Sequence, residues 1–266
     1  MPELAEIKIM ADYINQVCKN EDFTTISVSE SASARRLSVV QPSDLQIFEI
    51  SASARGKELM LTFSQGANAT LKLSCSMGMS GYWNFCNRED IPKHTHLKFN
   101  TISGYSLCLV DVRRFAKWKI VEDWSPNRGP CPLTQFSEFK QHIFDNLHRR
   151  EFDKPIHLVL MNQKYFSGVG NYIRAELLFR ANQDPFVSAR SAILENPLLL
   201  DLCYQIPYEA YLLGGGQLKD WDNPFKVPAG GFSEWIKCYG KSNRFIDKSG
   251  RTLWYHNSQV KTVQLI

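Results

Sequence analysis

The 266-residue chain carries 31 Lys and Arg residues against 27 Asp and Glu, and 44% of its residues are hydrophobic. This composition is typical of a globular protein with a substantial core and excludes a disordered or low-complexity chain. No apolar run approaches the roughly 20 residues that a membrane helix needs, and the start Met-Pro-Glu-Leu-Ala-Glu does not resemble a secretory signal. Seven cysteines without a Cys-x-x-Cys pair indicate reduced thiols. We therefore expect a soluble, intracellular protein, whose net charge of +4 permits a polyanionic partner without requiring one.

The first half of the chain is predicted to be one helix followed by strands. Apolar residues recur at three- and four-residue spacing over residues 3–18, which predicts a helix. From about residue 23 to 120 the period changes to two, with strands expected at 58–63, 69–73 and 106–110. Several short strands after one helix favour a sandwich or barrel. The predicted N-terminal domain covers residues 1–122.

A segment rich in proline and glycine, predicted as a linker over residues 123–133, separates this domain from a helical one at 134–266. Helical spacing predicts helices that begin near residues 136, 156, 172 and 197. The stretch 214–231 is glycine-rich and poorly patterned. The chain ends in a predicted hairpin, with strands over 243–246 and 251–255. The predicted fold class is α+β, with an N-terminal helix and β-sandwich followed by a helical domain with a terminal hairpin.

Pro2 is the first candidate for chemistry. The initiator methionine is normally removed before a small residue such as proline, which leaves a secondary amine. An α-amino group titrates near pH 8, against about 10.4 for lysine, so more of it is neutral and nucleophilic at pH 7. Such an amine can attack a sugar C1′ and form an iminium, with Glu3 placed to transfer a proton. The alternative is that Pro-Glu simply begins a helix well.

The glycine-rich turn Gly168-Val-Gly-Asn171 precedes a predicted helix. The free N–H groups and positive dipole end of that helix make a candidate phosphate site, to which Asn171 can add a side-chain donor. The alternative is an ordinary packing corner between two helices.

The terminal hairpin places Arg251 directly after a glycine turn, among other basic and aromatic residues. This mixture suits neutralisation of a nucleic-acid backbone and base stacking, or else a solvated hairpin. Two further segments could fill the space left by an everted base. Met79 lies in Gly78-Met-Ser-Gly81 and is otherwise a core residue. Arg113 and Phe115 lie in Asp111-Val-Arg-Arg-Phe115, which is otherwise a strand edge.

In this order, the motifs resemble the Fpg/Nei family of DNA glycosylases across nearly the whole chain. The resemblance is carried by Pro2-Glu3, Glu6, Gly56-Lys57, Gly-Met-Ser-Gly, Arg-Arg-Phe, and the Gln…Gly-Val-Gly-Asn-Tyr of a helix–two-turn–helix element. Within the family the chain is most similar to the animal endonuclease VIII-like 1 subgroup, above all in the segments 50–59 and 235–240.

The resemblance implies a role for each candidate residue. The catalytic residues would be Pro2 as nucleophile, Glu3 as general acid/base, and Lys57. Phosphates flanking the everted nucleotide would be held by Lys57, Asn171 and Arg251. The vacated stack would be filled by Met79, Arg113 and Phe115. The lesion pocket would include Glu6, Lys237 and Tyr239.

The chain also departs from many members of the family. Only Cys238 and His256 stand where relatives carry a four-cysteine zinc finger, so we expect no metal, no cofactor and a zincless finger at about 234–258. Ala5 replaces a more usual proline, and His157 stands where bacterial Fpg members carry a phosphate-binding lysine. Relatives of this subgroup continue into a long polar tail that could dock repair or replication proteins, and the 266 residues do not include such a segment.

The resemblance implies a bifunctional DNA glycosylase and AP lyase of base excision repair. It would remove oxidised pyrimidines, formamidopyrimidines and hydantoins through a Schiff base on the N-terminal proline, followed by β,δ-elimination. The expected partner is damaged DNA, as a duplex, with bubble and single-stranded DNA left open. We expect a nuclear monomer without a membrane. One alternative is a non-catalytic protein that binds damaged or single-stranded DNA on the same scaffold. Another is an 8-oxoguanine enzyme of Fpg type, which the missing zinc ligands and Lys237 disfavour.

Overall fold

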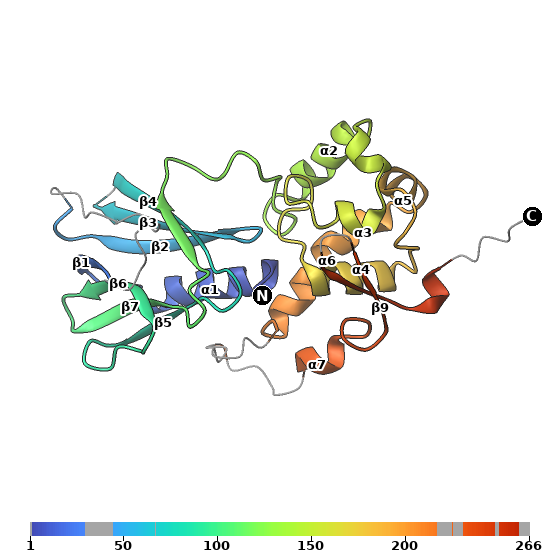
Figure 1. Cartoon of the computed structure of the whole chain (residues 1–266). Coiled ribbons are helices and arrows are strands. Elements are labelled where there is room, and N and C mark those ends of the chain that lie inside the picture. The colour runs from blue at the N-terminus through green and yellow to red at the C-terminus, as the bar shows by residue number, and fades with distance from the viewer. Residues whose placement is uncertain are drawn as a thin grey trace, which may run out of the picture. The chain divides into compact units, whose positions relative to one another are not determined.

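The computed structural model describes residues 2–29, 45–66, 68–216, 225, 231–247 and 250–260. The chain forms two compact units (Figure 1). The first contains Pro2 and the described residues of the ranges Glu6–Ser125 and Gly216–Lys226; the second contains those of Glu3–Ala5, Pro126–Gly215 and Val227–Ile266. Within the described ranges, no helix combines the length and the apolar character that crossing a membrane requires.

The first unit contains two four-stranded antiparallel sheets, with strand orders β1-β6-β7-β5 and β2-β3-β4-β8. The strands are β1 (Phe23–Val28), β2 (Glu49–Arg55), β3 (Glu58–Gln65), β4 (Asn68–Ser76), β5 (Tyr82–Asn87), β6 (Thr95–Thr101), β7 (Tyr105–Val110) and β8 (Lys117–Ile120). The sheets pack through aromatic side chains, because the rings of Phe63 on β3 and Phe99 on β6 have centroids 5.3 Å apart. This packing makes the unit a β-sandwich, as predicted.

Helix α1 (Leu4–Val17) is bound to strands of both sheets. The hydroxyl of Tyr13 accepts a hydrogen bond from the N–H of Phe85 on β5, at 2.9 Å. The side chain of Asn15 makes two hydrogen bonds to the backbone of Ala52 on β2, at 2.8 and 2.7 Å. Polar side chains thus fix the helix, while its apolar stripe is buried.

The second unit is helical and ends in a two-stranded hairpin. Its helices are α2 (Phe136–Asn146), η1 (Arg150–Asp153), α3 (Ile156–Val159), α4 (Asn171–Arg180), α5 (Ala189–Glu195), α6 (Leu198–Leu212), α7 (Gly231–Trp235) and η2 (Asn257–Gln259). Strands β9 (Asn243–Ile246) and β10 (Thr252–Tyr255) pair antiparallel. The core of this unit is apolar and aromatic, and the turns between α3 and α4 bury Phe166 and Val169 in it.

The predicted elements agree with these bounds over most of the described chain. The first helix, the three predicted strands, the four later helices and the final hairpin are all present. The short helices α5 and α7 were not predicted, because five to seven residues carry too little periodic pattern. Of the poorly patterned stretch, residues 217–224 and 226–230 lie outside the described residues.

Candidate functional site

Pro2 and Lys57 are the candidate catalytic residues of the first unit. Pro2 is buried, and it lies two residues before the start of α1 at Leu4. Lys57 lies in the two-residue turn of the β2–β3 hairpin, after Gly56, whose φ is +58°. Glycine at the first turn position accepts this positive φ without strain, which keeps the hairpin tight and fixes the backbone of the lysine.

The segments that carry Met79, Arg113 and Phe115 form two neighbouring loops of this unit. An added Cβ on Gly78 would lie 2.6 Å from the Cβ of Phe115, so the loops touch at this glycine. Met79 and Phe115 are 45% and 47% exposed, and the guanidinium carbon of Arg113 lies 4.8 Å from the Phe115 ring centroid. Large apolar side chains so exposed on tight turns are available to stack against a base. Residues 111–115 follow β7 as a turn, so the strand-edge alternative is wrong.

Asp111 holds the two loops in place, although sequence analysis gave it no role. Its carboxylate is fully buried. It accepts hydrogen bonds from the Ser80 hydroxyl at 2.5 Å and from the N–H of Ala116 at 2.6 Å. One buried carboxylate therefore ties the loop of Met79 to the loop of Phe115.

Glu3 belongs to the second unit, where its buried carboxylate lies at the N-terminus of α4. Its oxygens accept hydrogen bonds from the N–H groups of Tyr172 at 3.1 Å and Ile173 at 3.3 Å. The carboxylate also lies against Gly170, where any side chain would collide with it. The prediction that these N–H groups are free for a phosphate is therefore wrong: the protein's own carboxylate binds them. The helix dipole and both donors stabilise the charged carboxylate.

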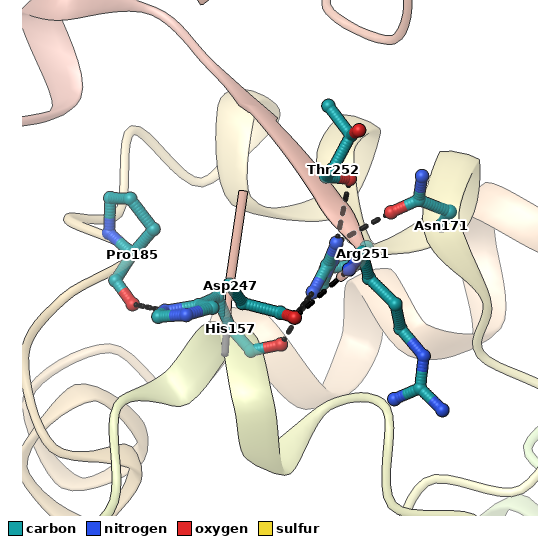
Figure 2. Close-up of polar contacts among 7 residues, drawn as sticks. His157, Asn171, Pro185, Asp247, Arg251 and Thr252 are labelled. Carbon is teal, nitrogen blue, oxygen red and sulfur yellow. Dashed lines mark hydrogen bonds and ion pairs between the residues drawn. The ribbon is translucent and has the colours of Figure 1, made fainter. Parts of the chain in front are cut away.

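Arg174 lies on α4, three residues after Asn171. Its guanidinium is fully buried and connects α4 to α3, to β10 and to Asp247. It donates hydrogen bonds to the Asn171 side chain at 2.5 Å, the His157 carbonyl at 3.1 Å and the Thr252 carbonyl at 3.0 Å (Figure 2). Asp247 lies 4.0 Å away as an ion-pair partner. Burial lowers the pKa of Arg174 to about 10, while Asp247 and Glu3 act to raise it. The hairpin is thus fastened to α4 by one buried cation.

Asp247 also sets the position of Arg251. Its carboxylate accepts a hydrogen bond from the Arg251 N–H at 3.0 Å, and its own N–H donates to the Arg251 carbonyl at 2.9 Å. Arg251 is exposed, and its guanidinium points away from the other labelled residues of the cluster (Figure 2). Asp247 thus fixes the backbone of Arg251, while the charged guanidinium of Arg251 is exposed to solvent.

Lys237 and Tyr239 lie on a loop that follows α7, and both are exposed. The Tyr239 ring packs near Tyr172 and Trp254, with centroids 6.3 and 6.2 Å away. Partial burial raises the pKa of Tyr239, as does the charge of Glu3, whereas a hydrogen bond with Asn171 lowers it. The Tyr239 side chain is therefore hydrogen-bonded to Asn171 and lies within the electrostatic influence of Glu3.

Comparison with known proteins identifies the family. Residues 1–118 match the family model described as the formamidopyrimidine-DNA glycosylase N-terminal domain. Human Endonuclease 8-like 1 is 35% identical over 286 residues, which cover 96% of this chain and 72% of the human protein; the mouse protein matches equally. The chain belongs to the Fpg/Nei family of DNA glycosylases.

Solved structures agree with this family and its fold. The Fpg (MutM) protein of Thermus thermophilus aligns with a TM-score of 0.77 at 25% identity, covering 97% of this chain and 98% of that one. Lactococcus lactis Fpg, in complex with DNA containing an oxidised pyrimidine, aligns with a TM-score of 0.79 at 21% identity and covers 98% and 100%. Both the α+β fold and the Fpg/Nei resemblance predicted from the motifs are confirmed.

His157, which stands in place of a lysine of bacterial Fpg members, and Glu6, a candidate for the lesion pocket, both form hydrogen bonds within this glycosylase. His157 is buried, and its Nδ1 bonds to the Pro185 carbonyl at 2.7 Å, while burial lowers its pKa. The imidazole of His157 is thus bound to a backbone carbonyl within the protein. Glu6 is also buried, and its Oε1 accepts a hydrogen bond from the Gly216 N–H at 2.7 Å. In the part of the chain that the structure describes, no three His, Cys, Asp or Glu residues form a possible metal site.

We expect Arg174→Met to destabilise this glycosylase by about 3–5 kcal/mol, because it leaves the buried Asp247 and three hydrogen-bond acceptors without their cation. The matched control is Lys154→Met, since Lys154 is an exposed residue of the same unit paired with Glu151. That change should cost about 1 kcal/mol or less. Urea unfolding of both variants measures the difference, and equal losses would contradict the role assigned to Arg174.

We expect Gly78→Ala to destabilise the first unit more than Gly104→Ala. Both glycines have positive φ, +59° and +94°, so each alanine bears a backbone cost of about 1–2 kcal/mol. At Gly104 the new Cβ meets open space, whereas at Gly78 it collides with Phe115. The overpacking should add roughly 1–3 kcal/mol. Equal unfolding midpoints for the two variants would show that the loops are not in close contact.

Proposed function

We propose that this DNA repair glycosylase is bifunctional: it excises oxidised pyrimidines, formamidopyrimidines and hydantoins, and then cleaves the strand at the resulting site. The observation that carries the proposal is the Pro2–Glu3 pair. Removal of Met1 would give Pro2 a secondary amine, and the neighbouring carboxylate is held in one position by two backbone N–H groups. An amine nucleophile beside an oriented acid/base group is the arrangement that iminium chemistry needs.

The reaction proceeds by bond exchange at C1′. The Pro2 nitrogen forms a bond to C1′ as the bond from C1′ to the base breaks, and the base leaves with a proton. Opening of the sugar ring gives an iminium, with Glu3 carrying the proton that the ring oxygen takes up. The iminium acidifies the C2′ proton, whose loss expels the 3′ phosphate; a second elimination expels the 5′ phosphate.

The remaining candidate residues bind damaged DNA. Lys57, Asn171 and Arg251 contact the phosphates that flank the everted nucleotide, and the exposed Arg251 guanidinium supports its part in this. Met79, Arg113 and Phe115 fill the vacated stack. The residues that contact the damaged base are Glu6 of the first unit and Lys237 and Tyr239 of the second. Solved Lactococcus lactis Fpg complexes with abasic-site DNA and with oxidised-pyrimidine DNA support this class of partner. We place the protein in the nucleus, as a monomer.

The deciding experiment is borohydride trapping on a duplex with one thymine glycol, followed by mass spectrometry of the cross-linked peptide. A DNA adduct on the N-terminal proline is expected. Base release without an adduct would indicate a monofunctional glycosylase, and binding without either would indicate the non-catalytic alternative. Competition between thymine glycol and 8-oxoguanine in the same assay tests the substrate class, with thymine glycol expected to be excised faster.

A further inference from the structure

Glu176 of α4 is fully buried, and its carboxylate faces the loop of residues 237–239. Oε2 accepts a hydrogen bond from the N–H of Lys237 at 3.0 Å. Oε1 accepts two more, from the N–H groups of Cys238 and Tyr239, each at 2.8 Å. A single carboxylate thus binds three consecutive backbone N–H groups.

This geometry fixes the loop strongly. Successive N–H groups that converge on one anion form a nest, and hydrogen bonds to a charged acceptor are about twice as strong as neutral ones. The anion here is a side chain of the rigid helix that also carries Asn171 and binds Glu3. Leaving any of the three donors unpaired would be costly at a buried position.

The same bonds decide which way the loop side chains point. Cys238 is fully buried, whereas its neighbours Lys237 and Tyr239 are exposed. A rotation of the loop backbone would move all three side chains together, since their N–H groups share one acceptor. The direction in which Lys237 and Tyr239 are presented is therefore set from α4.

We infer that Glu176 is a positioning residue for lesion recognition: it holds the loop so that Lys237 and Tyr239 contact the damaged base. This inference rests on the proposed function, in which the loop forms part of the lesion pocket. Glu176 does not touch the substrate, and the side chains that it positions are proposed to contact the damaged base, so its main effect falls on steps in which a base is present. Strand cleavage at a site that has already lost its base depends on it much less.

The test is Glu176→Gln, measured under single-turnover conditions on two substrates. The amide nitrogen of glutamine is a donor, so at least one of the three N–H groups loses its acceptor. We expect excision of thymine glycol to slow by about tenfold or more. Cleavage of a preformed abasic site should stay within about twofold of the wild-type rate, which is less than the effect of one ordinary hydrogen bond.

Ile193→Val is the matched control. Ile193 is buried on α5, not on the loop, so shortening its side chain should destabilise the same unit without changing the loop. This control variant should affect excision of thymine glycol and cleavage of the abasic site to the same small extent. If Glu176→Gln fails to fold, Gly240→Ala strains the same loop from its other end, at a φ of +77° with open space for the Cβ. The same selective loss is expected from it.

Three outcomes would overturn the inference. Unchanged excision would show that the loop needs no anchor, and parallel losses on both substrates would show that Glu176 is only structural. A wild-type protein without either activity would overturn the proposed function and the inference with it, so the two failures can be told apart.

Discussion

The Pro2→Thr protein is expected to lose base excision and borohydride trapping, by roughly three orders of magnitude or more. Threonine still permits removal of Met1, but it replaces the secondary ring amine with a primary one. A secondary amine gives an iminium that stays charged, whereas a primary amine gives an imine that must first take up a proton. The attack on C1′ that releases the base therefore loses the stronger nucleophile, and the electron sink that drives the later elimination is weakened as well. Single-turnover excision of thymine glycol measures the loss.

Binding of a tetrahydrofuran abasic-site analogue by Pro2→Thr should change little, because the residues proposed to bind phosphate are intact. Pro2→Gln supplies a stricter variant, since a bulky second residue retains Met1 and leaves the nitrogen of residue 2 in an amide. Full activity of Pro2→Gln would mean that the nitrogen of residue 2 is not the nucleophile, and the proposed mechanism would be wrong.

Replacing Glu3 by glutamine should reduce excision by about 10²–10⁴-fold, the usual contribution of a positioned acid/base group. The structure adds a second expectation. The glutamine amide can accept from only one of the two N–H groups, of Tyr172 and Ile173, and opposes the other with a donor. Stability should therefore fall by about 1–3 kcal/mol, which urea unfolding measures.

The control for Glu3→Gln is Glu209→Gln. Glu209 is another hydrogen-bonded carboxylate of the second unit, with Trp235 and Arg180 as partners, and charge-assisted hydrogen bonds from them lower its pKa, against the effect of its burial. This variant should lose stability and keep its excision rate per folded molecule. If both variants lost excision in proportion to stability, Glu3 would be a helix cap and nothing more.

Much of the fold could be predicted from sequence because its signals are local. A helix needs only the spacing of apolar residues along one segment, and α1 begins and ends within a residue of its predicted bounds. The same holds for the β2–β3 turn at Gly56-Lys57, where a glycine of positive φ decides the hairpin. The chemistry proposed for Pro2 is equally local, because it depends on the position of the residue next to the initiator methionine.

The partners of buried polar groups often lie far away in the chain, so they could not be predicted from the sequence. Asp111, Arg174 and Glu176 received no role from their sequence context, and each holds a candidate loop or strand in place. The N–H groups of α4 were expected to be free, yet they bind the carboxylate of Glu3, 169 positions away in the chain. Sequence thus determined most of the elements, the family and the nucleophile of the proposed reaction. The tertiary structure alone decided which buried charges hold the site together, because a buried polar group must be paired, and only the folded chain brings its partner within reach.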